Sequence, residues 1–130
     1  MLPLARASLY SWPMSESRPV VVHRKHEDRA QLFGRDGWWA DWIRNEAGDV
    51  SGWHHHAGND TYVYVTSGSL TIEFGPGGAE SVVVRAGDSF LVPSHTIHRE
   101  TTTGDADLEA VVCRVGGEPE RIDVDGPEPA

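Results

Sequence analysis

The chain has 130 residues, 38% of them hydrophobic, which suits one domain with a single continuous core. It carries 20 acidic side chains against 11 Lys and Arg, a formal net charge of −9. Such an acidic chain repels phosphate backbones and anionic lipid surfaces, so we expect neither a nucleic acid nor a membrane as its partner.

Cysteine usage and hydropathy indicate the compartment. Cys113 is the only cysteine, which excludes an intrachain disulfide and gives no sign of an oxidising compartment. Residues 1–6 lack the apolar core of a signal peptide, and no run approaches the roughly 20 apolar residues of a transmembrane helix. We therefore expect a soluble, cytoplasmic protein.

The beginning of the chain predicts irregular structure before the first strand. Prolines interrupt residues 1–18, which are expected to form a flexible arm or an edge strand that pairs with a neighbour. Met14 is a plausible alternative to Met1 as the native start. Residues 19–23 predict a short strand, and residues 26–33 predict two helical turns that end at the following glycine.

A tryptophan-rich strand is predicted over residues 38–44. With the strand period of two, Trp38 and Trp42 share one face while Trp39 and Ile43 share the other, so both faces are partly apolar. This pattern favours one face in a core and the other against a second chain. We therefore expect a homodimer.

Six further strand-like runs follow at near-even spacing, separated by turns rich in Gly, Pro, Ser and Asp. Many short strands with little helix are typical of an all-β sandwich or barrel. We expect one barrel domain over residues 19–116 and an acidic, proline-containing tail over 117–130, with residues 126–129 disordered. The six runs cover residues 61–66, 70–74, 81–85, 89–92, 97–102 and 108–115.

Three adjacent histidines provide the first chemical signal. On a strand His54 and His56 share one face, and His55 points the other way. That pair offers two imidazole ligands to a metal, and a third ligand has to come from elsewhere in the chain.

The spacing around these histidines resembles the first signature motif of the cupin superfamily: Gly, five residues, His-x-His, three or four residues, Glu, six residues, Gly. Here Gly48 precedes five residues, residues 54–56, four residues, Thr61, six residues and Gly68. The second motif is Gly, five residues, Pro-x-Gly, two residues, His, three residues, Asn. Its counterpart is Gly87, five residues, Pro-Ser-His at 93–95, two residues, His98, three residues and Thr102.

The resemblance implies a single-domain jelly-roll barrel in which His54, His56 and His98 bind one divalent metal ion. Three imidazoles with open coordination positions describe a catalytic site rather than a closed structural one. Imidazole suits several metals, so Fe(II) is favoured while Zn, Mn, Ni or Cu stay open.

The chain departs from the family pattern where a glutamate ligand is due. Thr61 takes that position, and a β-bulge that turned Asp60 inward is the alternative, so either is a candidate fourth ligand. His95 takes the place of the motif's glycine, in a turn that needs a positive φ. His95 and Glu100, which shares strand parity with His98, are the candidate catalytic residues.

The expected function is a mononuclear non-haem metal enzyme, dioxygenase-like, that oxidises a small organic molecule. A metal-dependent isomerase, cyclase or lyase on the same site is the alternative within enzymes, because a fold and a metal do not determine a reaction. The alternative from another class is a non-catalytic barrel that binds or senses a small molecule.

Overall fold

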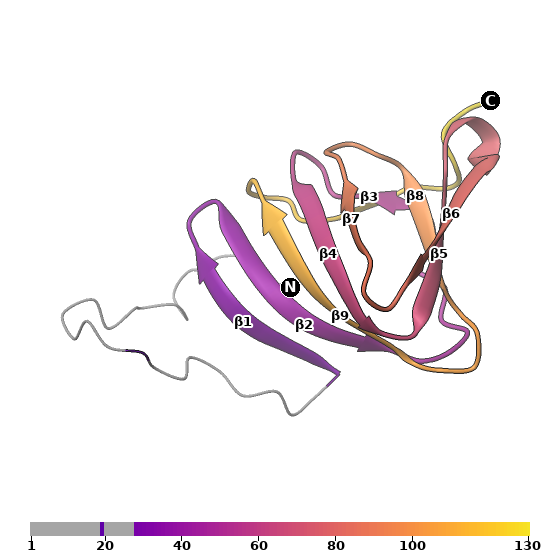
Figure 1. Cartoon of the computed structure of the whole chain (residues 1–130). Coiled ribbons are helices and arrows are strands. Elements are labelled where there is room, and N and C mark those ends of the chain that lie inside the picture. The colour runs from indigo at the N-terminus through magenta and orange to yellow at the C-terminus, as the bar shows by residue number, and fades with distance from the viewer. Residues whose placement is uncertain (1–18, 20–27) are drawn as a thin grey trace.

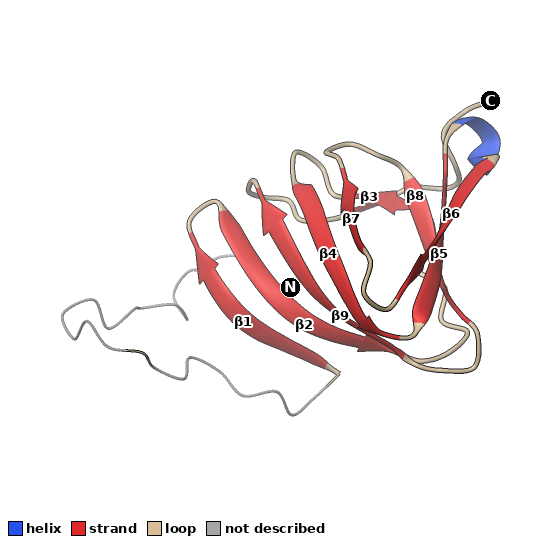
Figure 2. Cartoon of the chain, viewed as in Figure 1, coloured by secondary structure: helices blue, strands red, loops and turns tan. Residues whose placement is uncertain are grey.

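The computed structural model describes residue 19 and residues 28–130, in which two antiparallel sheets face each other (Figures 1 and 2). The first sheet has the strand order β1-β2-β9-β4-β7, and the second has the order β10-β3-β8-β5-β6. The elements are β1 (Arg29–Arg35), β2 (Trp38–Asn45), β3 (His54–His55), β4 (Asp60–Ser67), β5 (Ser69–Phe74), the 3₁₀ turn η1 (Pro76–Gly78), β6 (Glu80–Arg85), β7 (Ser89–Val92), β8 (His98–Thr103), β9 (Leu108–Val115) and β10 (Ile122–Asp123).

The predicted all-β jelly roll is confirmed. All seven strands expected between residues 38 and 115 form within one residue of their predicted limits. The tight turn between β4 and β5 depends on Gly68, whose φ is +78° and whose Cβ, if present, would lie 2.4 Å from the Asp107 carbonyl oxygen. Only a glycine fits a backbone approach this close.

The core lies between the sheets and follows the predicted strand parity. On β4, Thr61, Val63 and Val65 are buried, whereas the intervening Tyr62 and Tyr64 are exposed. The apolar cluster joins both sheets and consists of Trp39, Val63, Val65, Leu70, Ile72, Val84, Leu108, Ala110 and Val112.

The predicted helix over residues 26–33 is wrong for its described part, residues 28–33. Residues from Arg29 onward form β1, which pairs antiparallel with β2 and places Ala30 opposite Trp42. Main-chain pairing with the long, apolar β2 outweighs a local helical pattern of two turns, which is too short to be stable alone. The expectations for residues 1–18, for Met14 and for the strand at 20–23 lie outside the described residues.

The predicted disorder of residues 126–129 is also wrong. β10 pairs with β3, and beyond it the Gly77 N–H donates a hydrogen bond of 2.7 Å to the Glu128 carbonyl. The segment after residue 116 therefore closes over the edge of the second sheet. Within the described residues no helix is both long and apolar enough to span a bilayer.

Candidate metal centre

Three buried histidines converge on the inner side of the second sheet. His54 on β3 lies directly opposite His98 on β8, and His56 follows immediately after β3. His54 is 2% exposed, His56 3% and His98 0%. Their ligand nitrogens all lie within 4.8 Å of one another. The structure thus brings together the three histidines that the two sequence motifs indicate.

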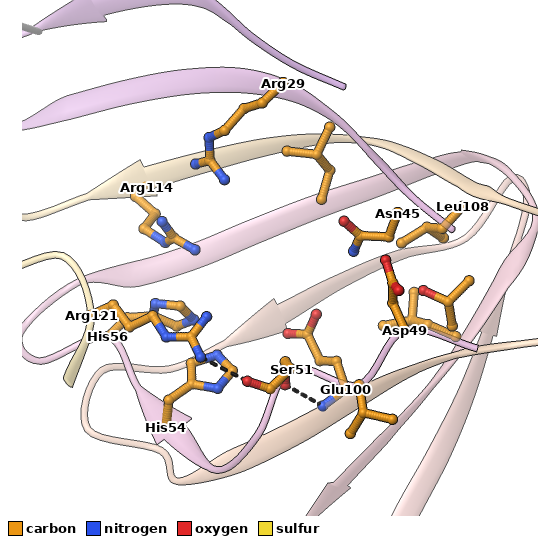
Figure 3. A pocket seen from close by; sticks show the side chains of 14 residues that line it. Arg29, Asn45, Asp49, Ser51, His54, His56, Glu100, Leu108, Arg114 and Arg121 are labelled. Atoms are coloured by element: carbon orange, nitrogen blue, oxygen red, sulfur yellow. Dashed lines mark hydrogen bonds between the residues drawn. The ribbon is translucent and has the colours of Figure 1, made fainter. Parts of the chain in front are cut away.

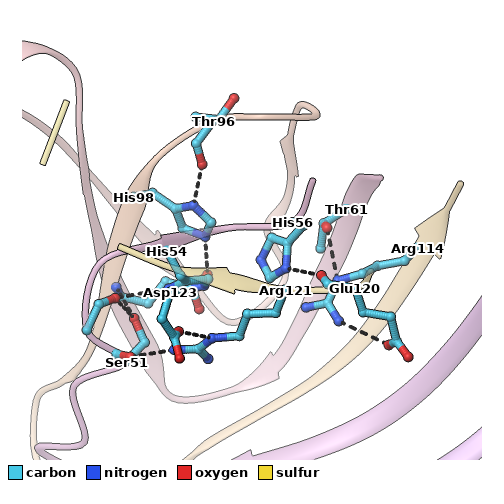
Figure 4. Close-up of polar contacts among 12 residues, drawn as sticks. Ser51, His54, His56, Thr61, Thr96, His98, Arg114, Glu120, Arg121 and Asp123 are labelled. Carbon is cyan, nitrogen blue, oxygen red and sulfur yellow. Dashed lines mark hydrogen bonds and ion pairs between the residues drawn. The ribbon is translucent and has the colours of Figure 1, made fainter. Parts of the chain in front are cut away.

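Each of these rings is held by a backbone carbonyl (Figure 4). The Nδ1 atoms of His54, His56 and His98 lie 3.0, 3.0 and 2.9 Å from carbonyl oxygens, which belong to Gly52, Glu120 and Thr96 respectively. A carbonyl only accepts, so each Nδ1 carries a proton, which leaves the three Nε2 atoms as the ones available to a metal. This arrangement is the one that orients metal-ligating histidines.

Glu100 adds an oxygen beside the imidazoles. Its Oε2 lies 3.1 Å from the Nε2 of His98. Without a metal, a proton on Nε2 makes this contact a hydrogen bond. A divalent ion can take the place of that proton between the imidazole and the carboxylate, so the residues present fit one.

Burial keeps two of the rings in the form that binds metal. It lowers the pKa of His54 to about 4, with a smaller opposing effect of the Gly52 hydrogen bond. Burial, followed by the positive charge of Arg114, lowers the pKa of His56 to about 2. Burial alone would raise the pKa of Glu100, but the hydrogen bond with His98 and nearby cations lower it overall. At neutral pH the site thus presents His54 and His56 as neutral imidazoles and Glu100 as a carboxylate.

A cavity of about 280 Å³ opens beside the histidines (Figure 3). His54, His56 and Glu100 line it, and we call it the metal cavity. Polar groups at one end are Asn45, Asp49 and Ser51, while Ile43, Leu70 and Leu108 supply apolar wall. The volume is near the lower limit for sites that bind small organic molecules.

Three arginines, Arg29, Arg114 and Arg121, also line the metal cavity. The sequence analysis did not identify them as site residues. The sequence alone could have indicated Arg114 as a site residue. It follows Leu108, Ala110 and Val112 on the inward face of β9 and is the one charged residue on that face. Arg29 was not identified because its segment was predicted to be helical. Arg121 was not identified because its segment was expected to lie outside the barrel.

The remaining candidates take other positions. The Thr61 hydroxyl accepts a hydrogen bond of 3.1 Å from Arg114 Nε. Asp60 accepts one from the Ser94 N–H, which ties it to a loop. His95 has the predicted positive φ, +60°, but its ring lies 5.9 Å from that of His55 and it does not line the metal cavity. Of the two candidate catalytic residues, the structure places only Glu100 in the cavity.

Comparisons with known proteins agree on the architecture. Uncharacterized protein YdbB of Bacillus subtilis (strain 168) is 43% identical over 47 residues, which cover 36% of this chain and 40% of YdbB, so the match spans less than half of that relative. BH2720 from Bacillus halodurans superposes with a TM-score of 0.67 at 20% identity, covering 88% of this chain and 92% of its own.

Two further solved structures share the fold. Oxalate oxidase in complex with the substrate analogue glycolate gives a TM-score of 0.64 at 20% identity, over 87% of this chain and 68% of that one. KdgF from Halomonas sp. gives 0.58 at 23% identity, over 69% and 79%. At these identities the likeness shows the fold alone. A family model described as "Cupin domain" matches residues 42–114, more than half of the sequence, and the chain belongs to the cupin family.

Proposed function

We propose that the protein is a mononuclear non-haem metal enzyme, dioxygenase-like, that acts on a small organic molecule, with Fe(II) as the favoured metal. The observation that carries this proposal is the set of three histidines whose ligand nitrogens lie within 4.8 Å of one another beside the metal cavity, while each Nδ1 is held by a carbonyl. A site with three protein ligands beside an open cavity leaves coordination positions for substrate, as catalytic sites do.

The roles of the chain's own residues follow from this geometry. His54, His56 and His98 would hold the ion on rigid strands, and Glu100 is placed to act as a fourth ligand or to accept a proton from substrate. When bound, the metal supplies Lewis acidity and a template for O₂ or substrate.

The proposal is tested by metal content and oxygen uptake. Protein purified without added metal, then loaded anaerobically with Fe(II), is expected to bind about one ion per chain and to consume O₂ with a member of a panel of diketones, thiols and phenols. Oxygen uptake should require both Fe(II) and substrate. A protein that takes up no Fe(II), Zn(II) or Mn(II) would contradict the proposal.

A second candidate, an isomerase, cyclase or lyase on the same metal site, is favoured by the position of Glu100. A half-buried carboxylate beside a bound ion would suit proton abstraction next to a polarised carbonyl. This reaction needs no O₂, so turnover under anaerobic conditions with incorporation of solvent deuterium would distinguish it. Tight ligand binding without turnover in either assay would indicate the non-catalytic binding or sensor barrel instead.

A homodimer is proposed as the assembly, and a cytoplasmic location stays a prediction. Support for the dimer comes from the outer face of the first sheet, where Tyr62, Tyr64 and Leu91 are 46%, 49% and 49% exposed. Clustered exposed aromatic and aliphatic side chains are typical of interfaces. Sedimentation at micromolar concentration is expected to give twice the chain mass of 14.3 kDa, and Tyr64→Glu is expected to give the monomer. A monomeric unmodified protein would contradict the proposal.

A further inference from the structure

The metal cavity holds an excess of positive charge although the chain as a whole is strongly acidic. Figure 3 shows the guanidinium groups of Arg29 and Arg114 side by side on one wall, with Arg121 near the histidines. These arginines come from β1, β9 and the segment before β10, three parts of the chain that meet only in the fold. A divalent ion on the histidines would add two further positive charges.

Two of the three arginines already have a close carboxylate. Arg29 Nη2 lies 2.8 Å from the buried Asp41, and Arg121 Nε lies 2.8 Å from Asp123. Each of these pairs neutralises its own guanidinium. Arg114 has the most distant carboxylate of the three, since its ion pair with Glu120 spans 3.9 Å.

Arg114 is nearly buried, its side chain being 13% exposed. Its Nε donates to Thr61 Oγ1, its Nη1 lies 3.9 Å from Glu120 Oε1, beyond hydrogen-bond distance, and its guanidinium covers the ring of Trp39 at 4.9 Å. A guanidinium carries five N–H donors, and the hydrogen bonds found among the described residues use one of them. Burial and the neighbouring Arg29 lower the pKa of Arg114 to about 10, so it stays charged at neutral pH.

The opposite end of the metal cavity has the reverse character. Asn45, Asp49 and Glu100 lie there, and their side chains offer oxygens that accept hydrogen bonds (Figure 3). Ile43 and Leu108 add apolar lining to the same cavity. A ligand that matches this lining carries an anion at one end, a short hydrocarbon body and a hydrogen-bond donor such as a hydroxyl at the other.

We propose that Arg114 binds the carboxylate of a small hydroxylated organic acid, and that this acid is the substrate class of the site. The proposal rests on the proposed function, because it places the body of the acid beside the metal ligands. The planar guanidinium fork matches the two oxygens of a carboxylate. Thr61 stands at the position where the family motif has a glutamate. Its hydroxyl accepts the hydrogen bond from Arg114 Nε and so fixes the guanidinium.

The test compares two probes that differ only at the anionic end, 3-hydroxybutyrate and butane-1,3-diol. Their dissociation constants are measured by NMR titration with the Zn(II)-loaded and the metal-free protein. We expect 3-hydroxybutyrate to bind at least about tenfold more tightly than the diol in both forms, because charge-assisted hydrogen bonds form only with the acid. Equal affinity for acid and diol would overturn the proposal.

Variants assign the effect to the guanidinium. Arg114→Met is expected to weaken binding of 3-hydroxybutyrate by about tenfold or more, and Arg114→Lys to weaken it less, since Lys keeps the charge without the fork. Arg85→Met, at an exposed position on β6 outside the metal cavity, is the matched control and should bind as the unmodified protein does. Should Arg114→Met not fold, as judged by circular dichroism, Arg114→Lys still decides the question, and affinity unchanged in it overturns the proposal.

The outcomes separate this inference from the proposed function. Zn(II) binding with no effect of Arg114 on the acid would refute the inference and leave the metal enzyme intact. No Zn(II) binding, with an Arg114-dependent affinity for the acid, would refute the metal function and keep the carboxylate site. Inorganic phosphate serves as a competitor, and displacement of the acid by a lower concentration of phosphate would reassign Arg114 to phosphate esters and overturn the proposal.

Discussion

Replacing His56 with Asn is expected to reduce the affinity for Zn(II) by at least about 100-fold, more than loss of a group that merely orients a ligand would cost. The Asn side chain can still donate to the Glu120 carbonyl in place of Nδ1, so the local hydrogen bond survives. What disappears is the Nε2 lone pair. Calorimetric titration of the metal-free variant with Zn(II) measures the effect directly.

The neighbouring histidine supplies the matched control. His55 lies outside the trio, and its Nδ1 accepts a hydrogen bond from the Ala57 N–H, which an Asn oxygen at the same position can replace. His55→Asn is therefore expected to bind Zn(II) as the unmodified protein does. If the two variants lost affinity equally, the assignment of His54, His56 and His98 as the ligand set would be wrong.

Acid is expected to destabilise the metal-free protein well above the pH at which ordinary carboxylates titrate. The folded-state pKa values of about 4 for His54 and about 2 for His56 lie below the unfolded value near 6.5. Below pH 6.5 these two histidines therefore bind protons in the unfolded chain but stay unprotonated in the folded chain. The free energy of unfolding falls as pH falls, by up to about 1.4 kcal/mol per pH unit for each of the two rings.

The pH range of this loss follows from the two values. The loss of stability due to His54 is complete near pH 4, whereas the loss due to His56 continues toward pH 2. Glu100 acts in the same direction, because a carboxyl with a lowered pKa loses its stabilising effect on acidification. Urea unfolding followed by tryptophan fluorescence at pH 7, 6 and 5 measures the slope, and His56→Asn should make it shallower. A free energy of unfolding that stayed constant from pH 7 to 5 would contradict the prediction.

The alternation of side chains along each strand predicted much of the core and of the metal site, because every strand of the barrel follows it. On β4, alternating small and aromatic residues place Val63 and Val65 inside and Tyr62 and Tyr64 outside without reference to any other strand. The same rule puts His54 and His56 on one face. Motif spacing then indicated His98, which pairs with His54 although 44 positions separate them (98 − 54).

The missing parts depend on contacts that local patterns do not contain. β1 is a strand because it pairs with β2, and a window of eight residues carries no information about that partner. The carbonyl of Glu120 and the side chain of Arg121 reach the site only because β10 pairs with β3. Arg114 is the exception, since a lone charge on an otherwise apolar strand face already indicates a special environment.

The carbonyl of Glu120 that holds His56 also determines when the site can exist during synthesis. Residues 54–56 leave the ribosome long before residue 120, so a nascent chain carries two of its histidines without the contact that orients one of them. A growing polypeptide therefore lacks the complete set of oriented imidazoles until its last barrel strand has been made. We therefore expect a chain that ends before residue 120 to bind a divalent metal ion more weakly than the 130-residue chain does.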